Sequence, residues 1–187
     1  MSIETAGICE ALRQRQSVLT QHHGDVRFVS DDRANRLLND LEKHPHAFVL
    51  ACLMDRQQKA ERCWMIPYVV QRRLGTFEFE DLAGLPRERV IEVMSSPEPL
   101  HRFTDIMARV FYGAIQHIAK QYSGNASRIW AGNLSSATIV KRFLEFDGAG
   151  PKIATMAANT LVRDFKIAVS DKISIDISVD AHVHRVF

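Results

Sequence analysis

Apolar residues recur at helical spacing along almost the whole chain. The pattern predicts amphipathic helices over residues 3–21 and 32–42, separated by the turn-like HHGD and the short apolar stretch FVS, with Ser30 as a candidate N-cap of the second helix. Residues 46–58 form a mostly apolar run, which is typical of a buried helix. The pattern therefore predicts an all-α fold.

Proline and glycine mark the limits of the later helices. Pro67 predicts a kink or break within residues 59–74, and Gly75 fits the end of that helix. The remaining helices are expected over residues 87–95 after Pro86, over 100–122 after Pro99 and up to Ser123-Gly124-Asn125, over 135–146, and over 152–165. A β-branched stretch, KIAVSDKISIDISV, then precedes the final DAHVHRVF.

Length and composition indicate one compact unit or two small lobes that share a core. The chain has 187 residues, of which 46% are hydrophobic, and a net charge of +2, which alone neither favours nor excludes nucleic acid as a partner. The start, MSIETAGICEALRQRQ, has no continuous apolar stretch, and no later run reaches transmembrane length. We therefore expect a cytoplasmic protein, nucleoid-associated in a prokaryote, with no membrane partner.

The cysteines and histidines give little reason to expect a metal. Cys9, Cys52 and Cys63 lack CxxC spacing, so we expect buried thiols rather than disulfides or metal ligands. The alternating polar residues of DAHVH have no third histidine or carboxylate at a signature spacing. The sequence therefore predicts no metal site.

The stretch FDGAGPKIATMAANT predicts two helices joined by a tight hairpin. Gly148 and Gly150 allow positive φ and close approach of another backbone, and Pro151 suits the first position of the second helix. The amides of the glycines and of the helix start would form a nest for a phosphate oxygen, with Lys152 at its mouth. A glycine-rich turn without a ligand fits these residues equally well.

The same stretch carries a resemblance. FDGAGPKIATMAANTL followed by SVDAHVHRVF resembles the helix-hairpin-helix and catalytic-aspartate loop of the HhH-GPD superfamily of DNA base-excision glycosylases, nearest to its endonuclease III-like branch. YSGNASRIWAGN resembles the loop before the hairpin helix, and HPHAFVLACLMDRQQKAERCW resembles a core helix that ends in a DNA-contacting glutamine. The matching positions are the hairpin glycines Gly148 and Gly150, the catalytic lysine Lys152, the branch's asparagine Asn159 and the catalytic aspartate Asp180.

The resemblance covers roughly residues 45–187 and implies two helical lobes that flank a cleft. It implies an N-terminal helical segment of the second lobe over residues 1–29 and a helical bundle lobe over 30–146. It also implies a helix-hairpin-helix over 135–165. Residues 166–187 would then form an insertion, the catalytic-aspartate loop and the start of a truncated C-terminal helix. No cysteine follows Cys63, so we expect no iron–sulfur cluster and no other cofactor. The chain ends soon after Asp180, so we also expect a truncated lobe that self-associates or is less stable.

The implied activity is excision of a damaged base followed by strand cleavage at the abasic site. Lys152 would attack C1′ to form a Schiff base, and Asp180 would stabilise the oxocarbenium-like sugar or prepare the nucleophile. The target nucleotide must leave the duplex, so Gln57 or Gln58 would fill the gap, and His182 would support the aspartate loop. A monofunctional glycosylase and a non-catalytic DNA-binding module are the alternatives, and oxidised pyrimidines, oxidised purines and alkylated bases are all open as substrates.

Charge favours a DNA-facing surface after the apolar run. Between Arg56 and Arg73 the chain carries five basic residues against Glu61 alone, a local charge of +4. The residues expected to contact double-stranded DNA with a damaged base or abasic site are Arg56, Gln57, Gln58, Lys59, Gly148, Ala149 and Gly150.

Two features of the chain differ from the family pattern. Phe146 and Asp147 stand where the family has leucine and proline before the first hairpin glycine, and KIAVSDKISIDIS lengthens the interval between Lys152 and Asp180.

Overall fold

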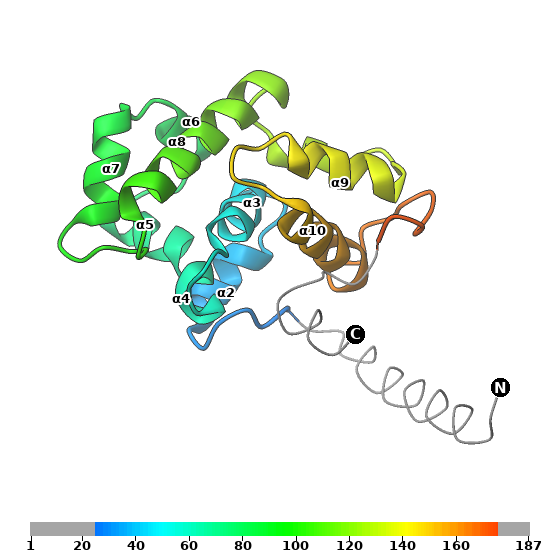
Figure 1. The fold of residues 1–187 in the computed structure, drawn as a ribbon, viewed down its shortest axis with the longest axis horizontal. Helices are drawn as coiled ribbons and strands as arrows, with labels where there is room; N and C mark the ends of the chain where they lie inside the picture. The colour runs from blue at the N-terminus through cyan, green and yellow to red at the C-terminus, as the bar shows by residue number, and fades with distance from the viewer. Residues whose placement is uncertain (1–24, 176–187) are drawn as a thin grey trace.

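The computed structural model describes residues 25–175, in which all regular secondary structure is helical (Figure 1). The helices are α2 (Asp32–Asn39), α3 (Pro45–Met54), α4 (Ala60–Trp64), α5 (Ile66–Leu74), α6 (Phe79–Ala83), α7 (Arg87–Ser95), α8 (Thr104–Gln121), the 3-10 helix η1 (Ala126–Ile129), α9 (Ser136–Leu144) and α10 (Pro151–Arg163). No strand occurs between residues 25 and 175, so the all-α expectation is confirmed for this range. The helix expected over 3–21, Cys9, Asp180 and His182 lie outside the described residues.

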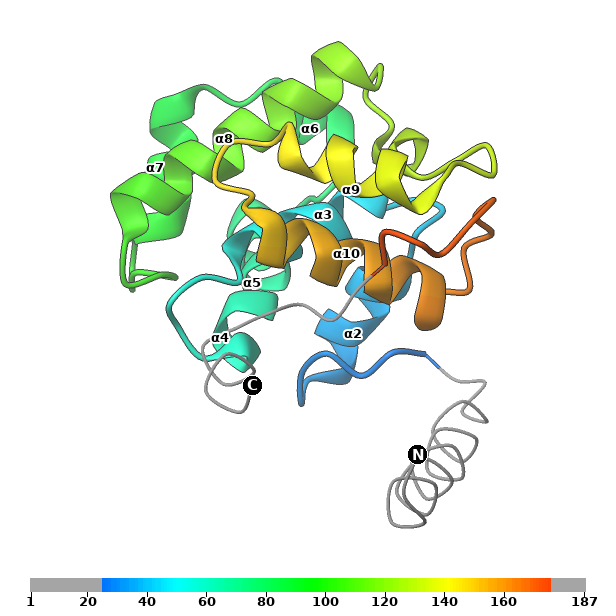
Figure 2. The same ribbon diagram turned by 45° about the vertical axis from the view of Figure 1, so that its right-hand side comes forward.

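Helix α3 forms the centre of the fold. All ten of its residues are buried, and it contacts α2, α4, α5, α8, α10 and η1. Figures 1 and 2 show the other helices arranged around it, with α9 and α10 in front of it in the second view. Its one strongly polar side chain, His46, donates from Nε2 to the Phe77 carbonyl oxygen at 2.8 Å. Burial lowers the pKa of His46 to about 4, so the neutral imidazole is the buried form.

Several helix limits follow the local signals in the sequence. The break expected near Pro67 is confirmed, because α4 ends at Trp64 and α5 begins at Ile66. Gly75 ends α5 with a φ of +80°, the left-handed conformation that glycine adopts without strain. Ser135 caps α9 by accepting a hydrogen bond from the Thr138 amide.

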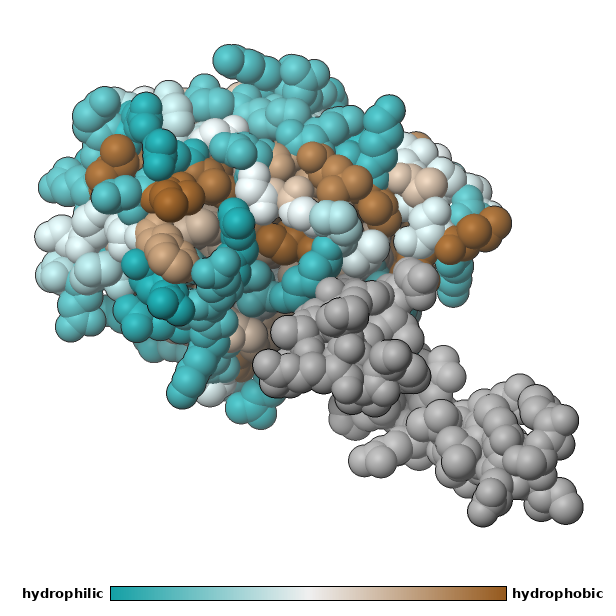
Figure 3. Space-filling model, viewed as in Figure 1, coloured by the Kyte–Doolittle hydropathy of each residue, from teal (hydrophilic) through white to brown (hydrophobic). Residues whose placement is uncertain are grey.

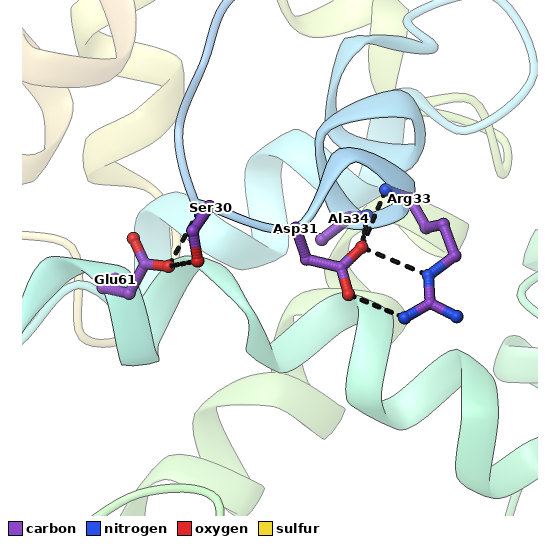
Figure 4. A network of polar contacts seen from close by, with 5 residues as sticks. All are labelled: Ser30, Asp31, Arg33, Ala34 and Glu61. Atoms are coloured by element: carbon purple, nitrogen blue, oxygen red, sulfur yellow. Dashed lines mark hydrogen bonds and ion pairs between the residues drawn. The ribbon is translucent and has the colours of Figure 1, made fainter.

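The N-cap of α2 is Asp31, so the expectation for Ser30 was wrong. The Asp31 carboxylate accepts the amides of Arg33 and Ala34 at 2.8 and 3.4 Å, and hydrogen bonds from Arg33 lower its pKa to about 2. Ser30 instead donates its amide and hydroxyl to Glu61 Oε1, at 2.8 and 2.6 Å (Figure 4). These bonds tie the segment before α2 to α4.

Two helices are shorter than their apolar runs. Helix α3 ends at Met54, four residues before the expected limit, and a turn follows it. Helix α8 begins at Thr104 rather than directly after Pro99. The intervening segment folds back on the end of α7, because the Leu100 amide donates to the Met94 carbonyl oxygen at 2.9 Å. The short helices α6 and η1 were not predicted.

One hydrophobic core runs through the described helices, from α2 to α10. Cys52 and Cys63 are buried in it as free thiols, as expected. The face drawn in Figure 3 is mostly hydrophilic and carries small separate hydrophobic patches. No helix between residues 25 and 175 is both long and apolar enough to span a membrane.

Candidate functional site

The hairpin between α9 and α10 requires a glycine at position 148. Gly148 has a φ of +81°, and a β-carbon there would lie 3.1 Å from Arg56 Nη1 and 3.2 Å from Val110 Cγ2. Gly150 differs, with a φ of −98° and open space at its β-carbon position. The expectation of positive φ and close approach therefore holds for Gly148 and was wrong for Gly150, which serves as the N-cap of α10.

The hairpin presents backbone amides at the start of α10. The Ala149 amide donates to the Phe146 carbonyl oxygen at 3.0 Å, so it is not available to a phosphate. In the described part of the chain the amides of Gly148, Gly150 and Lys152 donate to no acceptor. Free amides at a helix N-terminus can bind an anion.

The two candidate glutamines lie in the turn after α3 and have different environments. Gln57 is exposed and has a φ of +48°, an uncommon backbone conformation for a residue with a side chain. Gln58 is half-buried: its Nε2 donates to the Leu100 carbonyl oxygen at 3.4 Å, and its Oε1 accepts the Arg102 amide at 3.1 Å. Gln58 therefore holds the turn in place, whereas Gln57 lies at its surface.

A buried histidine supports the same turn, and sequence reasoning missed it. His101 is fully buried, and its Nδ1 accepts the Phe103 amide at 3.1 Å. The proton therefore lies on Nε2, which donates to the Arg56 carbonyl oxygen at 3.0 Å. Burial lowers the pKa of His101, which keeps the ring neutral. The short motif LHRF gives no signal for this role, because the contact joins residues 45 apart.

An ion pair joins the turn to the hairpin. Lys152 Nζ lies 3.3 Å from Asp55 Oδ2, although 97 residues separate them in the sequence. The lysine side chain is 42% exposed and the aspartate side chain 11%. Asp55 was not among the predicted site residues; its only sequence signal is that it directly follows the buried run of α3.

Two buried thiols lie beside this ion pair. Burial, with the Asp55 carboxylate as a further cause, raises the pKa of both Cys52 and Cys63. Such thiols carry little thiolate at neutral pH and are unreactive. Within the described range no group of three or more histidine, cysteine, aspartate or glutamate residues could hold a metal ion.

The basic residues between 56 and 73 do not form one free surface. Arg62 Nη2 donates to the Pro99 carbonyl oxygen at 2.8 Å, and Arg73 Nη2 donates to the Glu98 carbonyl oxygen at 2.9 Å. Burial lowers the pKa of Arg73, which is half-buried. Both arginines therefore hold the segment before α8. Lys59 and Arg72 are exposed.

The structure thus brings Arg56, Gln57, Gln58, Gly148 and Lys152 together at one place, where the turn after α3 meets the start of α10. Asn159 lies two turns after Lys152 on the same helix and is half-buried.

Comparison of the chain with family models, with curated proteins and with solved structures finds no match.

Proposed function

We propose that this protein is a DNA glycosylase with abasic-site lyase activity, acting on double-stranded DNA that contains a damaged base or an abasic site. One observation carries the proposal: two segments that the sequence resemblance assigns to DNA contact and to catalysis lie together. The Gly148 backbone packs against Arg56, and Lys152 lies 3.3 Å from Asp55.

The residues where the turn after α3 meets the start of α10 suit different roles in binding and catalysis. The free amides at the start of α10 would bind a phosphate of the DNA backbone, which gives contact without sequence selection. Gln57, exposed at the tip of its turn, would fill the space left by the flipped nucleotide. The Lys152 side chain is 42% exposed, so its amine can reach C1′ of a bound sugar. Asp180, outside the described residues, would stabilise the developing sugar cation.

Borohydride trapping on a duplex with an abasic site tests the proposal. The wild-type protein should form a covalent adduct, because borohydride reduces a Schiff base to a stable amine. Lys152→Ala should form none and should still bind the duplex, since only the amine is lost. Lys120→Ala, an exposed lysine in the last turn of α8, is the matched control and should trap like the wild type. Undiminished trapping by Lys152→Ala would contradict the assigned role.

The ion pair itself favours a second candidate, a DNA-binding module without lyase chemistry. An ammonium paired with Asp55 is not a nucleophile until it loses a proton. Duplex binding without an adduct and without base release would support this module. Base release without an adduct would indicate a monofunctional glycosylase. A panel of duplexes with oxidised pyrimidines, oxidised purines and alkylated bases would identify the substrate.

A further inference from the structure

We propose that Asp55 is the positioning residue for Lys152: it holds the amine at the start of α10 and takes up one of its protons before the amine attacks DNA. This inference rests on the proposed function and deepens it. The carboxylate is 11% exposed and the lysine side chain 42%, so protein encloses the aspartate while the lysine still reaches solvent. In the described range neither residue forms another ion pair.

The fold fixes Asp55 more firmly than it fixes the lysine. Asp55 is the C-cap of α3, the buried central helix, and its amide donates to the Cys52 carbonyl oxygen at 3.2 Å. A side chain attached to such a rigid element can hold a flexible lysine at one position. Among the described residues, the thiols of Cys52 and Cys63 interact with the Asp55 carboxylate, and Cys63 interacts with Lys152 as well. The Arg56 guanidinium lies against Gly148 at the same turn, and the buried His101 ring donates to the Arg56 carbonyl oxygen.

The proposed step balances protons and bonds. One proton moves from the Lys152 ammonium to Asp55 Oδ2, and the freed electron pair on Nζ forms a bond to the aldehyde carbon C1′ of an abasic site. A proton moves from nitrogen to the new alkoxide, which gives a carbinolamine. Asp55 then returns its proton to the hydroxyl group, which leaves as water, and the C–N bond becomes a protonated imine. The carboxylate is regenerated, and the positive charge stays on nitrogen.

The rate of borohydride trapping against pH tests this role. Asp55→Asn keeps the shape of the side chain and a hydrogen-bonding oxygen but accepts no proton. We expect it to trap roughly 10²-fold more slowly near neutral pH, with recovery as pH rises because hydroxide then removes the proton. Asp105→Asn, an exposed carboxylate in the first turn of α8, should match the wild type. An Asp55→Asn variant with the wild-type rate and pH profile would overturn the inference and leave the proposed function standing.

Two further measurements separate proton transfer from folding. Asp55→Asn should bind a tetrahydrofuran abasic-site analogue, which cannot form a Schiff base, as tightly as the wild type does. Asp55→Ala should regain part of its trapping rate when formate is added, because formate can enter the space and accept the proton. Slow trapping with neither recovery at high pH nor rescue by formate would overturn the role as proton acceptor. A wild-type protein that never traps would overturn both proposals.

Discussion

Gly148 lies against Val110 so closely that a β-carbon on the glycine would come within 3.2 Å of Val110 Cγ2. The same β-carbon would lie 3.1 Å from Arg56 Nη1. The hairpin between α9 and α10 therefore packs on α8 and on the turn after α3 only because residue 148 has no side chain. The position of Lys152, four residues later, depends on this contact.

The two hairpin glycines should respond differently to substitution. Gly148→Ala combines a φ of +81° with two close contacts, so it should lower the free energy of unfolding by about 1–3 kcal/mol and weaken duplex binding. Gly150→Ala has a φ of −98° and open space, so it should leave both nearly unchanged. Urea denaturation and binding to an abasic-site duplex check this. Equal losses in the two variants would show that the close approach at Gly148 does not matter.

Substitution of the two glutamines of the turn should also have different effects. Gln58→Ala removes hydrogen bonds to Leu100 and Arg102, so it should lower the free energy of unfolding by about 1–2 kcal/mol. Gln57→Ala should leave stability nearly unchanged, since this side chain is exposed. It should nevertheless reduce nucleotide flipping, followed by the fluorescence of 2-aminopurine placed beside an abasic site. Unchanged flipping in Gln57→Ala would assign the gap-filling role to another residue.

The features that the sequence predicted correctly depend on local chemistry. Pro67 marks the break between α4 and α5, and Gly75 ends α5 in the left-handed backbone conformation. Each signal acts within a few residues, so a single sequence is sufficient to read it.

The features that the sequence missed depend on contacts between distant segments. Asp31 and Ser30 are both good N-caps, and the bond from Ser30 to Glu61, 31 residues away, is what distinguishes them. Likewise the pairing of Asp55 with Lys152 exists only once α3 and α10 have packed together. Helical periodicity carries no information about either contact.

Asp147 places an exposed carboxylate beside the proposed phosphate site. Asp147→Asn should tighten duplex binding about twofold to threefold at low salt, because one exposed repulsion is removed, and the gain should shrink as salt screens it. Glu88→Gln, an exposed carboxylate in the first turn of α7, is the control and should change affinity less. Binding titrations at two salt concentrations measure the effect. An affinity that does not change at low salt would mean that this carboxylate points away from the DNA.

His46 should make the protein lose stability in mild acid. Burial lowers its folded pKa from 6.5 to about 4, so between these values the unfolded chain binds a proton that the folded protein does not. Stability is therefore complete above about pH 6.5 and falls as the pH drops towards 4. The shift corresponds to a loss of about 3 kcal/mol.

His46→Gln isolates this effect, because glutamine keeps an N–H donor for the Phe77 carbonyl oxygen and does not titrate. The measurement is the free energy of unfolding in urea at several pH values for both proteins. Groups that titrate in both, such as His101 and Asp31, cancel in the difference. The wild type should therefore lose stability relative to the glutamine variant as the pH falls from 6.5 to 4. If the difference in free energy of unfolding between the two proteins stayed constant over this pH range, His46 would take up its proton equally well in the folded and unfolded states. The folded core would then balance the charge of the protonated ring.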